Sequence, residues 1–249
     1  MIITLTTDIG WEYAGEMKGK ILSINPSAKI VDISHEVMPQ NIMQGAFILY
    51  SVAPHFKKAI HIGVVDPGVG TSRKAIIIKC GENYFIGPDN GMLIPAAKEI
   101  GIEKVYEIKV GKNASPVFHG RDVFAPAAGK ISSGIKPEKI AKEIKDYVDL
   151  SFGKAILKEG MISGKILFID RFGNIITNVC ERDLRRKKFF VRIGKIEREI
   201  KIYPSYGYAE EREIIGVIGS SGFLEVAMNK GNASQYFKAK EGERLEIFF

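Results

Sequence analysis

The chain has 249 residues, of which 45% are hydrophobic and 26% are charged, a composition typical of a globular protein with one large or two smaller domains. Lys and Arg outnumber Asp and Glu by 36 to 29, but the basic residues are scattered and the densest basic run, 182–188, contains an acid, which argues against a nucleic-acid partner. No apolar stretch is long enough to span a bilayer, and the first residues lack the pattern of a signal peptide, so we expect no membrane partner.

The first half of the chain alternates short apolar runs with segments of helical periodicity. Strands are expected at 2–6, 29–33, 59–65, 75–79, 84–87 and 105–110. Helices are expected between them, at 14–24, 41–52, up to residue 98, and at 124–132. This alternation predicts an α/β sandwich domain with a parallel-rich sheet.

The pattern changes near residue 150. The polar stretch 136–149 is expected to be helical, and short β-type runs then follow at 164–170, 174–179, 189–193, 197–202, 214–218, 224–227 and 245–249. Such runs, separated by glycine and charged turns, are typical of a small barrel or sandwich. We therefore predict an α/β domain over residues 1–153 and a β-barrel domain over residues 160–249.

Two cysteines, Cys80 and Cys180, lie far apart in apolar, strand-like surroundings. No group of His, Cys, Asp and Glu has the spacing of metal ligands. We therefore expect two buried, reduced thiols in a cytoplasmic protein and no metal site.

The segment 61–73 carries the strongest local signal for chemistry. An apolar run ends in the carboxylate of Asp66, and a Pro-Gly turn and a second glycine lead to Arg73. Loops at the carboxyl ends of buried strands are where open α/β sheets bind ligands. An ordinary strand end with a solvated salt bridge has the same sequence pattern, so the segment alone leaves both interpretations open.

Two further polar groups follow expected strands or precede expected helices in this domain. Asp8, after the first strand, is suited either to hold a ribose diol or to cap the next helix. His119 lies with an arginine and Asp122 between aromatic residues, just before a helix that Asp122 could cap. A single histidine is more often structural than catalytic, so its role also stays open.

In the second domain, residues 169–178 place polar groups and an aromatic ring at a turn between β-type runs. Gly173 and Asn174 could form a hairpin turn in which Asn174 supplies only a backbone with positive φ. Alternatively, Phe172 stacks on a base and Asn174 hydrogen-bonds its edge. The segments 219–225 and 231–234 offer backbone and hydroxyl donors with little side-chain bulk, which suits close contact with a small ligand.

Taken together and in this order, the motifs resemble those of the S-adenosylmethionine hydroxide adenosyltransferases, relatives of the bacterial fluorinase and chlorinase. The resemblance covers essentially the whole chain. Its carriers are TTDIG (6–10), MPQNIMQGAF (38–47), VVDPGVGTSRK (64–74), GPDNGML (87–93), FHGRDVFAP (118–126), IDRFGNIITN (169–178), SSGFLE (220–225) and GNAS (231–234).

The resemblance implies hydrolysis of S-adenosyl-L-methionine by attack of water on ribose C5′, which gives adenosine and L-methionine without a cofactor. It implies that a carboxylate, an arginine and a histidine surround the water, and these match Asp66, Arg73 and His119. The implied substrate-binding residues are Asp8 at the ribose hydroxyls, Asp170 at the methionine ammonium, Phe172 and Asn174 at adenine, Ser220, Ser221 and Glu225 near the methionine portion, and Ala233 at adenine through its backbone.

Some positions separate this chain from the halogenating relatives. These carry a tyrosine at the position of Asp66, a serine that holds the halide at the position of Gly120, and a long loop where this chain has only residues 80–83. The chain therefore resembles the water-using branch. Ser221 stands where fluorinase has an arginine for the methionine carboxylate, which leaves open how that carboxylate is held.

Two alternative functions remain at this point: a halogenase that makes 5′-halo-5′-deoxyadenosine, and a non-enzymatic RNA- or nucleoside-binding protein. The resemblance further implies a homotrimer, in which each site combines the first domain of one subunit with the second domain of its neighbour. The expected partners are thus a small-molecule substrate and other copies of the chain.

Overall fold

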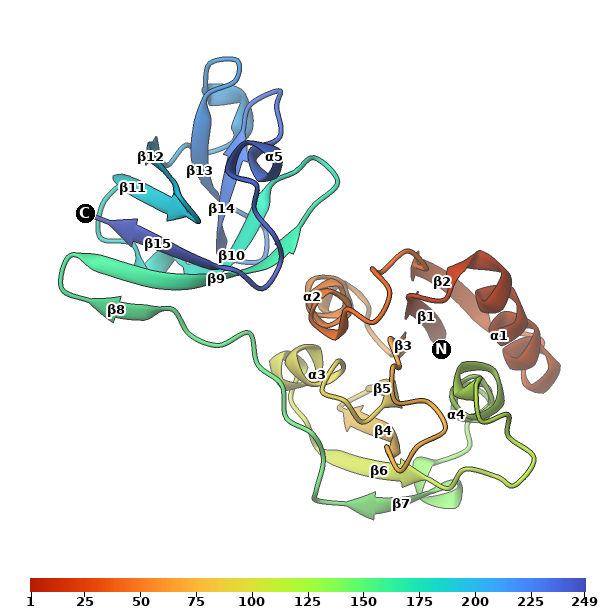
Figure 1. Ribbon diagram of the computed structural model, residues 1–249. Coiled ribbons are helices and arrows are strands. Elements are labelled where there is room, and N and C mark those ends of the chain that lie inside the picture. Colours follow the sequence, from red (N-terminus) through yellow and green to blue (C-terminus); the bar gives the residue numbers. More distant parts are fainter. The chain divides into compact units, whose positions relative to one another are not determined.

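Strand β1 (Ile2–Thr7) lies inside a seven-stranded sheet with the order β2-β1-β3-β5-β4-β6-β7, the framework of the first unit, Met1–Ser151 (Figure 1). The computed structural model describes residues 1–249. The other strands of the sheet are β2 (Lys29–Ser34), β3 (Ala59–Val64), β4 (Ala75–Cys80), β5 (Asn83–Pro88), β6 (Lys104–Ile108) and β7 (Ala141–Ile144).

The sheet is parallel in one half and antiparallel in the other. Strands β2, β1, β3 and β5 pair in parallel, whereas β4, β6 and β7 pair antiparallel to their neighbours. Strands β4 and β5 are joined by only two residues, and a link this short permits a hairpin but no parallel crossover. The predicted α/β class is confirmed, with the parallel pairing concentrated where the first three predicted strands lie.

Helices pack in two pairs, α1 (Gly10–Ile24) with α4 (Ala125–Ser132) and α2 (Ile42–Val52) with α3 (Ile94–Ile100), and Figure 1 shows the pairs on opposite faces of the sheet. Because side chains alternate along a strand, Ile3 and Leu5 point to one face, where they join Met17 of α1 in a buried core. A π-helical turn, Gly120–Phe124, precedes α4 and carries the polar motif at its start.

The predicted helix at 136–149 is wrong. This stretch contains a short 3₁₀ turn, Pro137–Lys139, and then strand β7, which pairs antiparallel with β6 at the edge of the sheet. The Lys- and Glu-rich composition favours a helix locally, but pairing with the free edge of β6 outweighs that weak preference.

The second unit, Phe152–Phe249, is an antiparallel sheet that nearly closes on itself. Its strands are β8 (Ile156–Lys158), β9 (Met161–Ile169), β10 (Ile175–Cys180), β11 (Lys188–Ile193), β12 (Ile196–Lys201), β13 (Ile214–Ile218), β14 (Phe223–Met228) and β15 (Arg244–Phe248). The order is β12-β11-β15-β9-β10-β14-β13, with β8 on β9, and a bridge between Ile202 and Gly216 links the two edges. The predicted barrel is therefore confirmed.

Cross-strand pairs of branched side chains fill the interior of this barrel. Val191 of β11 faces Ile247 of β15, and Ile193 faces Leu245, with all four side chains buried. A short helix, α5 (Ala233–Phe237), packs against β14.

Both cysteines are free thiols, of which Cys80 is buried and Cys180 is half-buried. No helix in either unit combines the length and the apolar character that crossing a membrane requires.

Candidate active site

Asp8 and Asp66 follow neighbouring parallel strands at the same edge of the first sheet. Thr7 of β1 pairs with Val64 of β3, so the loops after both strands start side by side. A cavity of about 290 Å³ opens there, and its lining includes both carboxylates together with His119. Arg73 contacts two of these residues, Asp66 and His119, directly. The four predicted site residues of the first unit therefore lie together at one edge of its sheet.

Arg73 joins the side chains of Asp66 and His119. Its Nε donates to Asp66 Oδ1 at 3.1 Å and its Nη2 donates to Asp66 Oδ2. The same Nη2 also donates to His119 Nδ1 at 3.1 Å. The Asp66 side chain is 6% exposed and that of Arg73 is 8% exposed. The alternative of a solvated salt bridge is therefore wrong, since this ion pair is withdrawn from water.

The contact with Arg73 determines where His119 carries its proton. A guanidinium only donates, so His119 Nδ1 accepts and the ring hydrogen of the neutral imidazole lies on Nε2. Burial, with the neighbouring charge of Arg73 adding to it, lowers the pKa of His119. The histidine is thus a neutral donor through Nε2 at neutral pH.

Asp66 responds to burial in the opposite direction. Burial raises the pKa of the Asp66 carboxyl, and the positive charge and hydrogen bonds of Arg73 only partly oppose this rise. Arg73 favours the ionised form of the carboxylate, but burial is the larger influence on its pKa. A carboxylate made more basic in this way is a stronger proton acceptor than one in water.

Several positioning contacts around Asp66 were not predicted from the sequence. Asn90 donates from Nδ2 to the carbonyl oxygen of Val65 at 2.7 Å, which fixes the backbone next to Asp66. Gly70 has a φ of +76°, and a Cβ on it would lie 2.2 Å from the carbonyl oxygen of Pro116. Both residues occur in recognisable motifs, but their partners lie 25 and 46 residues away, so only the fold reveals the contacts.

Neither aspartate proposed as a helix cap has that role. The residue at the start of α1 is Ile9, with no side-chain cap, and Asp8 Oδ2 instead accepts from the backbone N–H of Gln40 at 2.8 Å. Asp122 accepts from the N–H of Ser115 at 2.9 Å and pairs with Arg121, which holds the loop before His119.

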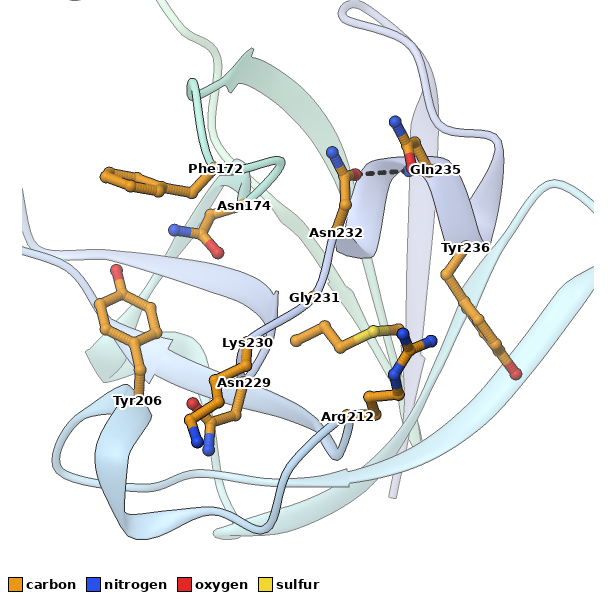
Figure 2. A pocket seen from close by; sticks show the side chains of 11 residues that line it. Phe172, Asn174, Tyr206, Arg212, Asn229, Lys230, Gly231, Asn232, Gln235 and Tyr236 are labelled. Carbon is orange, nitrogen blue, oxygen red and sulfur yellow. Dashed lines mark hydrogen bonds between the residues drawn. The ribbon is translucent and has the colours of Figure 1, made fainter.

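The second unit has a larger cavity of about 870 Å³, lined by Phe172, Asn174, Tyr206, Arg212, Met228, Asn229, Lys230, Gly231, Asn232, Gln235 and Tyr236 (Figure 2). Figure 2 shows Phe172, Asn174 and Tyr206 on one side of it and Tyr236 on the other. The Phe172 side chain is 74% exposed, so its ring is available for stacking, whereas Asn174 is buried. Positive φ at this turn belongs to Gly173, at +84°, and not to Asn174. The interpretation in which Asn174 supplies a left-handed backbone is therefore wrong.

The remaining predicted residues lie behind or beside this cavity. Asp170 hydrogen-bonds to Asn174, and Glu225 accepts from the hydroxyl of Tyr206, so each touches a lining residue. Burial raises the pKa of Glu225, and the nearby charge of Asp170 adds to this effect. Three predicted residues are not among the lining residues: Ser220 and Ser221, in the turn between β13 and β14, and Ala233, buried at the start of α5.

Comparisons with known proteins cover both units. The family model for the SAM hydroxide adenosyltransferase N-terminal domain matches residues 3–141, and the model for the C-terminal domain of the same family matches residues 164–246. The (R)-S-adenosyl-L-methionine hydrolase of Methanocaldococcus jannaschii is 36% identical over 100% of this chain and 96% of its own length. The hydrolase of that name from Thermus thermophilus is 33% identical, with 97% of each chain covered.

More distant and structural relatives agree with these matches. A fluorinase from Nocardia brasiliensis is 22% identical over 99% of this chain and 96% of its own. A crystal structure of an uncharacterised conserved protein from Thermotoga maritima covers 100% of both chains, with 37% identity and a TM-score of 0.92.

Proposed function

The chain belongs to the SAM hydroxide adenosyltransferase family, and on that premise we propose that it hydrolyses S-adenosyl-L-methionine to adenosine and L-methionine. One observation carries the proposal beyond family membership: a buried Asp66–Arg73–His119 cluster shares a cavity with Asp8. This arrangement suits a reaction that must orient a water molecule and remove its proton.

In the proposed reaction, water attacks ribose C5′ in line with the bond from C5′ to sulfur. The new bond joins the water oxygen to C5′, and the electron pair of the breaking bond stays on sulfur as a neutral thioether. Since this leaving group needs no proton, the site needs only a base on the side of the water. Asp66 accepts the proton, and a base in this role contributes roughly 10²–10⁴-fold to the rate.

Arg73 and His119 prepare the water for this step. Arg73 holds the Asp66 carboxylate through two nitrogens, so that its orientation does not change between turnovers. His119 donates from Nε2 to the water oxygen, which leaves the water hydrogens directed at Asp66. Asp8 accepts hydrogen bonds from the ribose hydroxyls in the same cavity.

We assign this chain the (R) sulfonium form as its substrate, because the curated relatives with the highest identity reported above carry that stereochemistry in their name. The (R) and (S) forms differ in configuration at sulfur. With the adenosyl part held in the same place, the methyl group and the methionine chain exchange positions between the two forms. The test is hydrolysis of separated (R) and (S) forms, with turnover of (S) at least as fast as that of (R) contradicting the assignment.

We further propose a homotrimer in which sites are shared between subunits. Its support is that the candidate residues divide between two units, with catalytic groups in one cavity and the proposed base-binding groups in another. Mixing and reassembling inactive His119→Ala and Asn174→Ala proteins should restore activity, because some sites would then carry neither change. A monomer that is fully active when dilute would contradict the trimer.

A cytoplasmic location is in keeping with the two free cysteines.

The reaction itself is tested with isotopically labelled water. In H₂¹⁸O the proposed attack puts ¹⁸O in the 5′-hydroxyl of adenosine and none in methionine, which mass spectrometry of the two products distinguishes. A parallel incubation with chloride or fluoride tests the halogenase alternative, for which 5′-halo-5′-deoxyadenosine is the diagnostic product. Adenosine without ¹⁸O, or no turnover of either sulfonium form, would contradict the proposal.

A further inference from the structure

Residues 170–174, between β9 and β10, form a loop that is closed by the carboxylate of its first residue. Asp170 Oδ1 accepts from the backbone N–H groups of Phe172 and Asn174, both at 2.9 Å. Asp170 Oδ2 accepts from the side-chain nitrogen of Asn174 at 2.8 Å. All three hydrogen bonds stay within the loop, so Asp170 organises it from inside.

The third of these hydrogen bonds determines which way the Asn174 amide faces. A carboxylate only accepts, so the NH₂ group of Asn174 must lie on the Asp170 side and its carbonyl oxygen on the other. Asn174 lines the cavity of the second unit, and in Figure 2 its oxygen lies nearer the middle of that cavity than its nitrogen does. The group presented to a ligand is therefore an acceptor.

The loop is also anchored from outside. The carbonyl oxygen of Gly173 accepts from the N–H of Ser234 at 2.9 Å, which ties the loop to the start of α5. A Cβ on Gly173 would lie 2.2 Å from the side chain of Asn232, so the two segments are in direct contact. Asn174 thus has neither a mobile backbone nor a free amide with which to adapt to different ligands.

We propose that Asp170 is a positioning residue that fixes Asn174 as an acceptor and so makes this cavity select a 6-aminopurine over a 6-oxopurine. This inference rests on the proposed function, in which the cavity holds the purine base against Phe172. The amino group of adenine donates to Asn174 Oδ1. The oxygen of hypoxanthine would face that same oxygen, and both acceptors would lose their hydrogen bonds to water.

The restraint by Asp170 is what turns this contact into a selection. A free asparagine rotates its amide by half a turn and then donates to a 6-oxo group as readily as it accepts from a 6-amino group. In this loop such a rotation would place the Asn174 oxygen against the Asp170 carboxylate. Asp170 uses three of its roughly four lone-pair directions in the loop, so an additional contact with an ammonium group is compatible with this role.

The decisive variant is Asp170→Asn in the full-length protein. The new amide keeps an oxygen for the two backbone N–H groups but turns an NH₂ group toward Asn174, whose amide then rotates and presents its NH₂ to the cavity. We expect the parent to prefer adenosine over inosine by about tenfold or more, and the variant to lose or reverse that preference, measured by calorimetry. Neither nucleoside carries the amino-acid part, so any loss of ammonium binding does not enter the ratio.

Asp183→Asn is the matched control. Asp183 Oδ2 accepts from the backbone N–H of Cys180 at 2.9 Å in another turn of the same unit, and it is not among the residues that line the cavity. This variant should keep the parent's ratio of adenosine to inosine affinity. An unchanged ratio in Asp170→Asn, with normal adenosine binding by the parent, would overturn the inference and leave the proposed function intact. A parent that binds neither nucleoside would contradict the proposed function itself.

A measurement on the parent alone covers the case in which Asp170→Asn does not fold. Purine riboside has only hydrogen at C6, so it neither donates to Asn174 nor repels it. A fixed acceptor predicts the order adenosine, purine riboside, inosine, with affinity falling roughly 3- to 10-fold at each step. Inosine binding more tightly than purine riboside would show that the amide rotates freely, and the inference would be wrong.

Discussion

A single nitrogen of Arg73, Nη2, donates both to the carboxylate of Asp66 and to Nδ1 of His119. The orientation of the carboxylate and the tautomer of the imidazole therefore depend on the same guanidinium. Any change at this position alters the base and the neighbouring donor together.

Replacing Arg73 with Met removes the charge and the donors but keeps an unbranched side chain. Arg73 lowers the pKa of Asp66 while burial raises it, so the variant's Asp66 has a pKa higher still. Because the base must be ionised, the rising limb of the pH–rate profile should move to higher pH, and kcat at its plateau should fall. Lys74→Met, which removes a neighbouring cation paired with the exposed Asp146, is the control and should leave the limb unchanged. A limb that stays in place in Arg73→Met would exclude Asp66 as the titrating base.

Asp66→Asn tests the base itself. The amide keeps an acceptor for Arg73 but cannot take the proton of water, so kcat should fall roughly 10²–10⁴-fold while adenosine affinity is retained. Asp149→Asn removes an exposed carboxylate paired with Lys98 and should keep parental kcat. Melting temperatures of both variants distinguish a catalytic loss from unfolding. Parental kcat in Asp66→Asn would rule out the proposed proton acceptor.

Alanine substitutions at two glycines with positive φ distinguish the effect of backbone strain from the effect of a specific contact. Gly70→Ala places a Cβ against the carbonyl oxygen of Pro116, whereas Gly81→Ala, at a φ of +58°, meets open space. Both variants should lose about 1 kcal/mol of stability from the left-handed backbone. Only Gly70→Ala should also lower kcat, because the loop of Asp66 is then pushed from the loop before His119. Equal kcat values for the two variants would show that this contact does not position the site.

The burial of His61 predicts that the protein loses stability at acidic pH. Its side chain is buried, with Nδ1 hydrogen-bonded to Thr4 at 2.8 Å, and burial lowers its pKa from 6.5 to about 4. Between these values the unfolded chain binds a proton that the folded chain does not, so stability falls as the pH is lowered from 6.5 to 4. The difference corresponds to about 3 kcal/mol.

The measurement is denaturant unfolding at pH 7 and pH 4. His61→Gln cannot titrate in this range, so its stability should depend on pH less steeply than the parent's. His55→Gln changes an exposed histidine and should keep the parent's dependence. The same pH dependence in His61→Gln and the parent would mean that this histidine is not the source.

Local pattern was enough to predict most of the second unit, because short runs rich in β-branched residues between glycine and charged turns favour strands. The expected run 214–218, for example, is strand β13, whereas β8 was missed, since its three residues are all exposed and carry no alternation. The stretch 136–149 failed for a related reason, because β7 exists only through its pairing with β6.

The contacts of the site likewise divide into those that local sequence could suggest and those that only the fold reveals. Asp66 and Arg73 lie seven residues apart on one loop, so sequence could suggest their pairing, and the family resemblance added His119. The contacts of Asn90 with Val65 and of Gly70 with Pro116 join distant segments, and no local rule indicates them. Sequence also could not reveal that burial outweighs Arg73 in its effect on Asp66, because burial belongs to the folded chain.

The loop 170–174 has a consequence for protein design. The three hydrogen bonds of the Asp170 carboxylate begin and end within five consecutive residues. At Gly173 the loop also depends on two contacts with the segment before α5: the hydrogen bond from the N–H of Ser234 and the close approach of Asn232. The segment can therefore be grafted onto a hairpin of another protein that has the same strand geometry, supplies a backbone N–H to the carbonyl oxygen of this glycine and leaves room beside it. Asp or Asn at position 170 would then determine whether the asparagine at position 174 presents an acceptor or a donor. The rest of the host protein would need no redesign.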